Sequence, residues 1–291
     1  MSALTLQSKL KINNGLEIPI LGFGLWKTPP EQAEEACTEA LNAGYRHLDS
    51  AAAYKNEAGA GAAIRKASPG IPRSEIFFTS KVRYITYDDA KTQVSRTLQE
   101  TGLDYIDLML LHCPYGGSAN RKGAWKALVE AQEAGLVRSI GVSNYGVHHL
   151  DQLETHIREL EAERGGAGRG GQINVVQYEI HPWCPRDDIV QWCRQRDVVV
   201  EAYSPLVRGE RWGEEPLKKL AEKHAVTEAQ ILLRWSLQKG YVPLPKSVHP
   251  DRIKKNTDVY GFELSEEDMA LLTTTKYKPV CWDPTVSPMD N

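Results

Sequence analysis

The stretch IDLMLLH at residues 106–112 is a nearly continuous apolar run that ends in a histidine. Comparable short runs occur along the whole chain, at residues 18–22, 46–49, 76–81, 139–143, 174–179, 198–202 and 241–245. Their continuous apolar character predicts strands that are buried on both faces, as in a parallel sheet covered by helices.

Amphipathic helical patterns separate these runs. Apolar residues at positions 33, 36, 37, 40 and 41 recur at three- and four-residue spacing, and similar faces lie within residues 90–101, 125–129 and 231–235. About eight strand–helix units in one series predict a (β/α)8 TIM barrel, with residues 1–291 as a single domain. A doubly wound open sheet is the alternative. Its first strand would be followed by a glycine-rich phosphate turn, but GFGLWK at residues 22–27 has a lysine in place of the third glycine.

Three segments lie outside this repeat. Residues 10–18, with Asn13-Asn14-Gly15 at their centre, predict an N-terminal β-hairpin that closes the bottom of the barrel. The short C-terminal tail, residues 277–291, contains Trp282 among prolines and is expected to fold over the active-site mouth. Residues 161–172 are rich in glycine and are expected to form a flexible surface loop, although similar Arg-Gly-Gly triplets occur in proteins that bind single-stranded nucleic acid.

The composition excludes several classes of protein. With 41% hydrophobic and 25% charged residues, the chain is neither disordered nor fibrous, and a net charge of −3 indicates no nucleic-acid or membrane partner. Neither a membrane-spanning run nor a secretory signal pattern is present. The five scattered cysteines have no zinc-like spacing, so they predict free thiols and no metal site. We therefore expect a cytoplasmic protein, and a monomer.

Polar side chains end nearly every predicted strand. They are Asp49 (with Tyr54 in the loop that follows), Lys81, His112, Ser143-Asn144, Gln177, Tyr203-Ser204 and Lys246-Ser247. In a (β/α)8 barrel the carboxyl ends of all strands meet at one mouth, so these side chains are expected to converge. Each residue alone is compatible with a loop or core role, but the whole set predicts an active site.

The motifs that contain these residues resemble those of the aldo-keto reductases. The segment LDSAAAYKNE at residues 48–57 is similar to the family signature LDTAxxYxNE, and GVSN (141–144), QYEIHP (177–182), YSPL (203–206) and LPKSV (244–248) resemble further blocks in the same order. The short loop 114–123 and the short tail resemble the compact microbial and fungal members. The resemblance implies NADPH-dependent reduction of a small-molecule aldehyde or ketone to an alcohol.

The residues themselves suit that chemistry. Hydride addition leaves negative charge on the carbonyl oxygen, so the site needs a hydrogen-bond donor that can release its proton. Tyr54 is the expected general acid, and the ammonium of Lys81 is expected to lower its pKa. Asp49 would orient Lys81, and His112 would donate a second hydrogen bond to the substrate oxygen.

Cofactor contacts are expected on both sides of the mouth. Ser143, Asn144 and Gln177 could hold a nicotinamide carboxamide, and Tyr203 offers a flat face for the ring. The last strand is followed by basic and hydroxyl side chains beside a predicted helix at 250–256, which predicts a site for a 2′-phosphate and thus NADPH/NADP+ over NADH. These phosphate-site residues are Lys246, Ser247 and Arg252. The resemblance adds Gly24, Leu25, Trp26, Ser204, Leu206, Val248 and Asn256 to the cofactor contacts.

The substrate pocket is expected to comprise Trp26, Tyr54, His112, Cys113 and Trp282. Cys113 occupies a position where many family members carry tryptophan, so one wall of the pocket is expected to be smaller.

Two other functions are compatible with parts of the pattern. A barrel glycosidase could use Asp49, Glu179 and Glu201 as acidic pairs, although this leaves Lys81 and Tyr54 without a role. A non-catalytic NADPH-binding regulatory module on the same fold is the other. Turnover of carbonyl compounds separates this module from the reductase.

Overall fold

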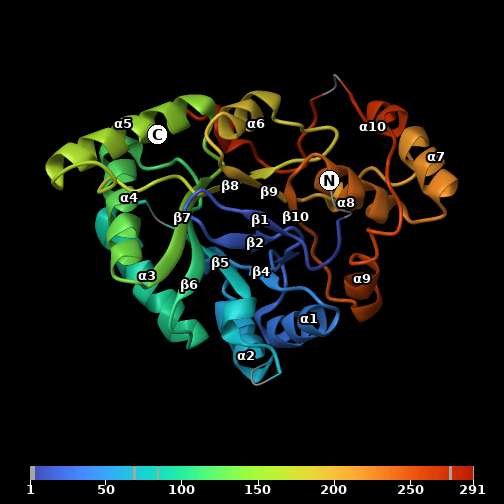
Figure 1. Ribbon diagram of the computed structural model, residues 1–291, viewed down its shortest axis with the longest axis horizontal. Coiled ribbons are helices and arrows are strands. Elements are labelled where there is room, and N and C mark those ends of the chain that lie inside the picture. The colour runs from blue at the N-terminus through green and yellow to red at the C-terminus, as the bar shows by residue number, and fades with distance from the viewer. Residues whose placement is uncertain (1–3, 68–69, 84, 275–276, 291) are drawn as a thin grey trace.

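The barrel is formed by one sheet of eight parallel strands in the order β3 to β10, as seen in a computed structural model that describes residues 4–67, 70–83, 85–274 and 277–290 (Figure 1). The strands are β3 (Phe23–Gly24), β4 (His47–Asp49), β5 (Phe77–Val82), β6 (Ile106–Leu111), β7 (Val137–Ser143), β8 (Val175–Glu179), β9 (Val199–Tyr203) and β10 (Val242–Leu244). Backbone hydrogen bonds from Gly22 N to Pro243 O (3.1 Å) and from Gly24 N to Pro245 O (2.9 Å) connect the first strand to the last. The predicted (β/α)8 fold is confirmed.

Helices connect the successive strands and cover the outside of the sheet (Figure 1). They are α1 (Pro30–Asn42), α2 (Glu57–Ala67), α3 (Tyr87–Thr101), α4 (Gly117–Glu133), α5 (Val147–Glu163), α6 (Asp187–Arg194), α7 (Glu215–His224), α8 (Glu228–Gln238), α9 (Pro250–Lys255) and α10 (Glu266–Leu271). The predicted apolar face of α1 is buried at all five positions from Ala33 to Leu41. The helix α3 ends at Gly102, whose positive φ of 63° gives the left-handed turn that glycine adopts without steric cost.

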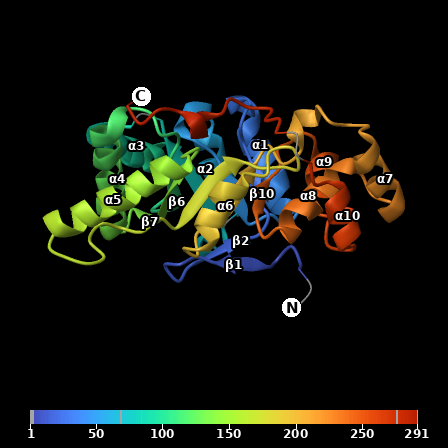
Figure 2. The same ribbon diagram turned by 90° about the horizontal axis from the view of Figure 1, so that it is seen from above.

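The N-terminal hairpin closes the bottom of the barrel, as expected. Strands β1 (Lys9–Lys11) and β2 (Glu17–Pro19) pair antiparallel, and Ile12 and Ile18 are fully buried. These two side chains belong to an interior cluster with Phe77, Leu108, Leu110, Val175, Val199, Val242 and Leu244. The hairpin and the C-terminal tail therefore lie at opposite ends of the barrel (Figure 2).

Two boundaries predicted from the sequence are wrong. The first barrel strand was expected at residues 18–22 but is β3, because Ile18 already pairs with Leu10 in the hairpin. Burial is continuous from Ile18 to Leu25 across both structures, so apolar character alone does not separate them. The loop expected at residues 114–123 is also shorter, because α4 begins at Gly117.

The glycine-rich stretch after α5 is held against the neighbouring helix. Arg164 and Arg169 both bind the carboxylate of Glu133 on α4, at 2.7 Å and 3.1 Å. The carbonyl of Gly170 accepts a hydrogen bond from the indole of Trp125. Both arginines of the two Arg-Gly-Gly triplets are therefore paired with a carboxylate of α4.

Within the described residues, no helix combines the length and the apolar character needed to cross a membrane.

Candidate active site

A cavity of about 590 Å³ opens at the carboxyl ends of the barrel strands. Most of the predicted site residues line it, although they come from segments far apart in the sequence. They are Gly24, Trp26, Asp49, Tyr54, His112, Cys113, Ser143, Asn144, Gln177, Tyr203, Ser204, Leu206, Lys246 and Trp282. This convergence is the geometry expected for the mouth of a (β/α)8 barrel.

The other predicted residues are not on the cavity wall. Lys81 and Leu25 are fully buried behind it. Ser247, Val248, Arg252 and Asn256 follow β10, with Arg252 exposed on α9 and Asn256 buried at the end of that helix. Of the residues predicted to bind a phosphate, Lys246 therefore faces the cavity, whereas Ser247 and Arg252 lie beyond its edge.

Lys81 and Asp49 form a buried ion pair at the base of the cavity. The Lys81 Nζ donates to both carboxylate oxygens of Asp49 at 2.8 Å and to the carbonyl of Ser50 at 2.7 Å. Burial alone would lower the pKa of Lys81, but the charge and hydrogen bonds of Asp49, together with the nearby Tyr54 and Glu201, outweigh it and hold this pKa above its ordinary value. Lys81 is therefore a permanent positive charge behind the cavity wall.

Tyr54 ends a short 3-10 turn, Ala52–Tyr54, in the loop after β4. Asn56 fixes this loop: its Oδ1 accepts from the Ser50 hydroxyl at 2.7 Å, and its Nδ2 donates to the carbonyls of Leu25 (2.9 Å) and Thr28 (3.0 Å). The sequence analysis assigned Asn56 no role. Its position in the LDSAAAYKNE motif, two residues after Tyr54, was the available signal.

The ammonium of Lys81 lies 5.1 Å from the centroid of the Tyr54 ring. Burial raises the pKa of Tyr54 to about 12, and the positive charge of Lys81 only partly opposes this rise. The expectation of a net lowered pKa is therefore wrong, because the free energy needed to remove the phenolate from water exceeds the stabilisation that the charge of Lys81 provides. The direction of the lysine's effect is as expected.

The imidazole of His112 faces the Tyr54 ring edge-on, with 5.7 Å between the ring centroids. Burial and the nearby charge of Lys81 lower the pKa of His112 to about 3, so the ring is neutral. A neutral imidazole carries one N–H donor. Tyr54 and His112 thus present two hydrogen-bond donors to the same part of the cavity.

The predicted amide and hydroxyl side chains at the ends of β7, β8 and β9 bind one another and their neighbours. Asn144 Nδ2 donates to the His112 carbonyl and to Ser143 Oγ, both at 3.0 Å, and Asn144 Oδ1 accepts from the Tyr203 hydroxyl at 2.8 Å. Gln177 Nε2 donates to Asp49 Oδ2 at 2.8 Å. These bonds fix the orientation of these side chains. The side-chain oxygen atoms of Ser143 and Gln177 can still accept further hydrogen bonds.

Basic side chains on the cavity wall were missed in the sequence analysis. Besides Lys246, the wall includes Lys27, Arg83 and Arg208, whereas its carboxylate Asp49 is already bound to Lys81. Arg83 directly follows β5 (Phe77–Val82), Lys27 lies in the loop after β3, and Arg208 lies in the 3-10 turn Val207–Gly209 after β9. Their charge excess and the nearby hydroxyl and amide groups fit a polyanionic dinucleotide.

Comparison with known proteins agrees with the geometry. The model of the aldo/keto reductase family matches residues 20–276. The chain belongs to this family. An uncharacterized oxidoreductase of Schizosaccharomyces pombe is 39% identical over 98% of this chain and 100% of its own length, and a glyoxal reductase of Bacillus subtilis is 38% identical over 91% of each chain. The crystal structure of an aldo/keto reductase from Brucella melitensis has a TM-score of 0.82 at 37% identity, covering 91% of this chain and 98% of that one. As a family member, this aldo/keto reductase is an oxidoreductase.

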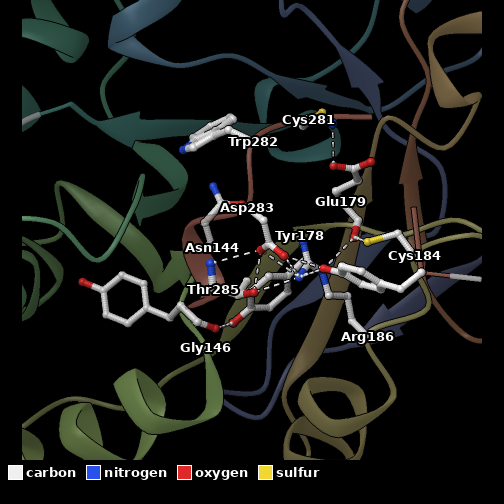
Figure 3. A network of polar contacts seen from close by, with 12 residues as sticks. Asn144, Gly146, Tyr178, Glu179, Cys184, Arg186, Cys281, Trp282, Asp283 and Thr285 are labelled. Atoms are coloured by element: carbon white, nitrogen blue, oxygen red, sulfur yellow. Dashed lines mark hydrogen bonds and ion pairs between the residues drawn. The ribbon is translucent and has the colours of Figure 1, made fainter. Parts of the chain in front are cut away.

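The C-terminal tail of the reductase contributes to the cavity wall through Cys281 and Trp282. Glu179, at the end of β8, accepts hydrogen bonds from the backbone N–H groups of Val280 (2.5 Å) and Cys281 (3.0 Å). The Arg186 guanidinium binds the tail a few residues further on, as Figure 3 shows. The tail is therefore fixed at two points on either side of Trp282.

The Arg186 anchor is buried. Its Nη1 lies within hydrogen-bond distance of both carboxylate oxygens of Asp283 (2.9 and 3.0 Å) and of the Thr285 hydroxyl (2.8 Å) (Figure 3). The same nitrogen also contacts the hydroxyl of Tyr277. The side chain of Arg186 is 4% exposed, and that of Asp283 is 17% exposed. The prediction that the tail covers the mouth agrees with these contacts.

The carboxylates proposed for a glycosidase do not face the cavity together. Asp49 binds Lys81, and Glu179 is occupied by the tail and by His181 Nε2 at 2.8 Å. Glu201 is fully buried inside the barrel, and neither glutamate lines the cavity. The lysine that faces Asp49 is the feature that argues against glycoside hydrolysis.

Proposed function

We propose that this aldo/keto reductase reduces an aldehyde or ketone to the alcohol with NADPH, using Tyr54 as the general acid. The observation that carries the proposal is the arrangement of the Tyr54 phenol, the neutral His112 ring and the buried Lys81–Asp49 pair at one end of the cavity. Its relative in Bacillus subtilis is a glyoxal reductase, which favours a small aldehyde as the substrate.

The side chains divide the work of the reaction. The nicotinamide, when bound, supplies the hydride. Tyr54 holds its proton at neutral pH, because burial raises its pKa to about 12, and gives it to the oxygen on which negative charge develops. The N–H of His112 donates to the same oxygen, which lowers the energy of the charged transition state. Lys81 stabilises the phenolate that Tyr54 leaves behind, and Asp49 holds Lys81 in place.

NADPH is proposed over NADH because of the basic residues around the end of β10. Lys246 lines the cavity, and Arg252 is exposed as the third residue of α9, where its planar guanidinium could bind a phosphate through two hydrogen bonds. The charges of Lys27 and Arg208 lie 4.6 Å and 4.3 Å from the centroid of the Trp26 ring, so this part of the wall also attracts phosphate groups.

A reducing compartment is proposed as well. All five cysteines are free thiols, and three of them are buried. Such unpaired thiols are typical of cytoplasmic proteins.

The test is the oxidation of NADPH and of NADH with a panel of aldehydes, keto esters and sugars, followed by absorbance. Tyr54→Phe is expected to lower kcat by about 10²- to 10⁴-fold while leaving NADPH binding unchanged, because it removes only the transferable proton. Tyr87→Phe, on the outer helix α3, is the matched control and is expected to retain full activity.

Three results would count against the proposal. If Tyr54→Phe is about as active as the parent, Tyr54 is not the general acid. If the enzyme prefers NADH, the proposed 2′-phosphate site is wrong. Tight NADPH binding without turnover of any carbonyl compound favours the regulatory module instead.

A further inference from the structure

Glu201 is a second carboxyl group beneath the proposed catalytic pair. It lies on β9 with its side chain inside the barrel and fully buried. Its Oε2 accepts a hydrogen bond from Gln177 Nε2 at 2.7 Å, and the same nitrogen donates to Asp49 Oδ2 at 2.8 Å. One amide group therefore connects the two carboxyl groups.

The other oxygen of Glu201 has no hydrogen-bond partner among the described residues. His47 Nε2 on β4 lies 3.4 Å from this oxygen, but this nitrogen forms its hydrogen bond with the Thr79 hydroxyl at 3.0 Å. Burial and the charge of Lys81 lower the pKa of His47 to about 3, so the ring supplies no positive charge. A buried carboxylate anion with an unpartnered oxygen is costly, whereas the protonated acid is much less so.

The charges around Glu201 point in the same direction. Asp49 on β4 and Lys81 on β5 form one neutral pair, Gln177 comes from β8, and the residue that pairs with Glu201 on β10 is the apolar Val242. Asp49 binds the ammonium directly and Glu201 does not. Burial and the charge of Asp49 raise the pKa of Glu201. Burial also raises the pKa of Asp49, but the charge and hydrogen bonds of Lys81 oppose that rise, so of the two carboxyl groups Glu201 holds the proton.

We propose that Glu201 is a positioning residue that acts on the reaction through Gln177. In its protonated form it is a neutral acceptor that orients the Gln177 amide toward Asp49 and leaves Lys81 with a single counter-charge. When Glu201 loses its proton, a second negative charge faces Lys81, and the ammonium stabilises the Tyr54 phenolate less. This role rests on the proposed reductase activity, because it concerns the acid that the reaction uses.

The first measurement is the pH profile of kcat/KM for carbonyl reduction between pH 6 and 10. The parent enzyme is expected to lose activity on the alkaline side as Glu201 ionises. Glu201→Gln keeps an acceptor for Gln177 and cannot ionise, so its alkaline limb is expected to move upward by about one pH unit or more. Asp107→Asn, which removes a buried carboxyl on β6 away from the cavity wall, is the control and is expected to keep the parent profile.

Glu201→Met separates positioning from charge. It cannot ionise either, but it no longer accepts the bond from Gln177, so its alkaline limb is expected to move upward while kcat falls. A parent-like kcat in Glu201→Met contradicts the positioning role. If the alkaline limb of the pH profile is unchanged in Glu201→Gln, the ionisation of Glu201 does not control the activity.

The second measurement does not depend on activity. For an acid whose pKa is higher in the folded state, stability is lost as pH rises from the unfolded pKa through the folded one. The unfolding constant of the parent is therefore expected to rise relative to that of Glu201→Gln, by up to about tenfold per pH unit in that window, in urea titrations from pH 5 to 9. If the ratio of the two unfolding constants does not change with pH, Glu201 is not protonated in the folded enzyme. If the parent reduces no carbonyl compound, the proposed function and the positioning role fail together, while this ratio still reports the protonation state.

Discussion

Replacing Lys81 by methionine tests how much the buried ammonium contributes to the reaction. Methionine has a similar length and no charge, so the change removes the positive charge that lies 5.1 Å from the Tyr54 ring. With an effective dielectric constant of about 20, the attraction between that charge and a phenolate at this distance is about 3 kcal/mol. Because about 1.4 kcal/mol corresponds to a factor of ten, kcat is expected to fall by about 200-fold.

The assay is steady-state reduction of the best aldehyde from the panel, together with NADPH binding followed by fluorescence. The loss is expected in kcat, while the dissociation constant of NADPH changes little, because Lys81 is not on the cavity wall. Lys81→Met also leaves Asp49 without its partner, so the double variant Lys81→Met/Asp49→Asn is the control for a stranded carboxylate. A Lys81→Met enzyme with nearly the parent kcat would refute the electrostatic role of the lysine.

Two further variants test the tail and the sheet. Arg186→Met removes the buried guanidinium that anchors the tail. It is expected to raise KM for the substrate about tenfold with little change in kcat, because a hydrogen bond to a charged group contributes about 1.5 kcal/mol. An unchanged KM would show that the tail keeps its position without this anchor. Gly141→Ala is expected to lower the free energy of unfolding by about 2 kcal/mol or more in urea titrations, because the added methyl group would lie 1.8 Å from the Val175 carbonyl oxygen. Parent-like stability of that variant would contradict the close approach of β7 and β8.

The sequence predicted the fold well because its strands are buried on both faces. Short apolar runs between amphipathic helical faces gave seven of the barrel strands in nearly their observed positions, for example β6 (Ile106–Leu111). The first strand was misplaced for a physical reason. The hairpin residue Ile18 and the barrel residue Phe23 are both buried, so hydropathy does not distinguish them, and only backbone pairing does.

The site was predictable where its residues end strands. Asp49, Lys81 and His112 follow apolar runs directly, and the fold brings them together without further information. Lys27 lies in a loop and Arg208 in a 3-10 turn between strand and helix, where nothing in a single sequence indicates the direction of a side chain. The loops are placed only by contacts that depend on the complete fold.

The effect of Lys81 on the pKa of Tyr54 was predicted in the right direction, but the net shift was not, for a related reason. The sequence shows that Lys81 is near the phenol in a barrel, so the direction of the charge effect follows. It does not show how much water reaches the phenol, and burial is the larger of the two effects. The protonation state of Glu201 could not be predicted either. Glu201 is far from Asp49 along the chain, and only the folded structure shows that Gln177 connects the two carboxyl groups.

The buried Lys81–Asp49 pair is better explained by chemistry than by stability. Taking both charges out of water costs several kcal/mol per ion, and replacing such a pair with uncharged groups of similar size is often neutral or stabilising. The double variant Lys81→Met/Asp49→Asn is therefore expected to be at least as stable as the parent in urea, although it has lost the charge that assists Tyr54. If it is instead much less stable and the remaining folded enzyme is active, the pair is a structural element and the proposed role of its ammonium is wrong.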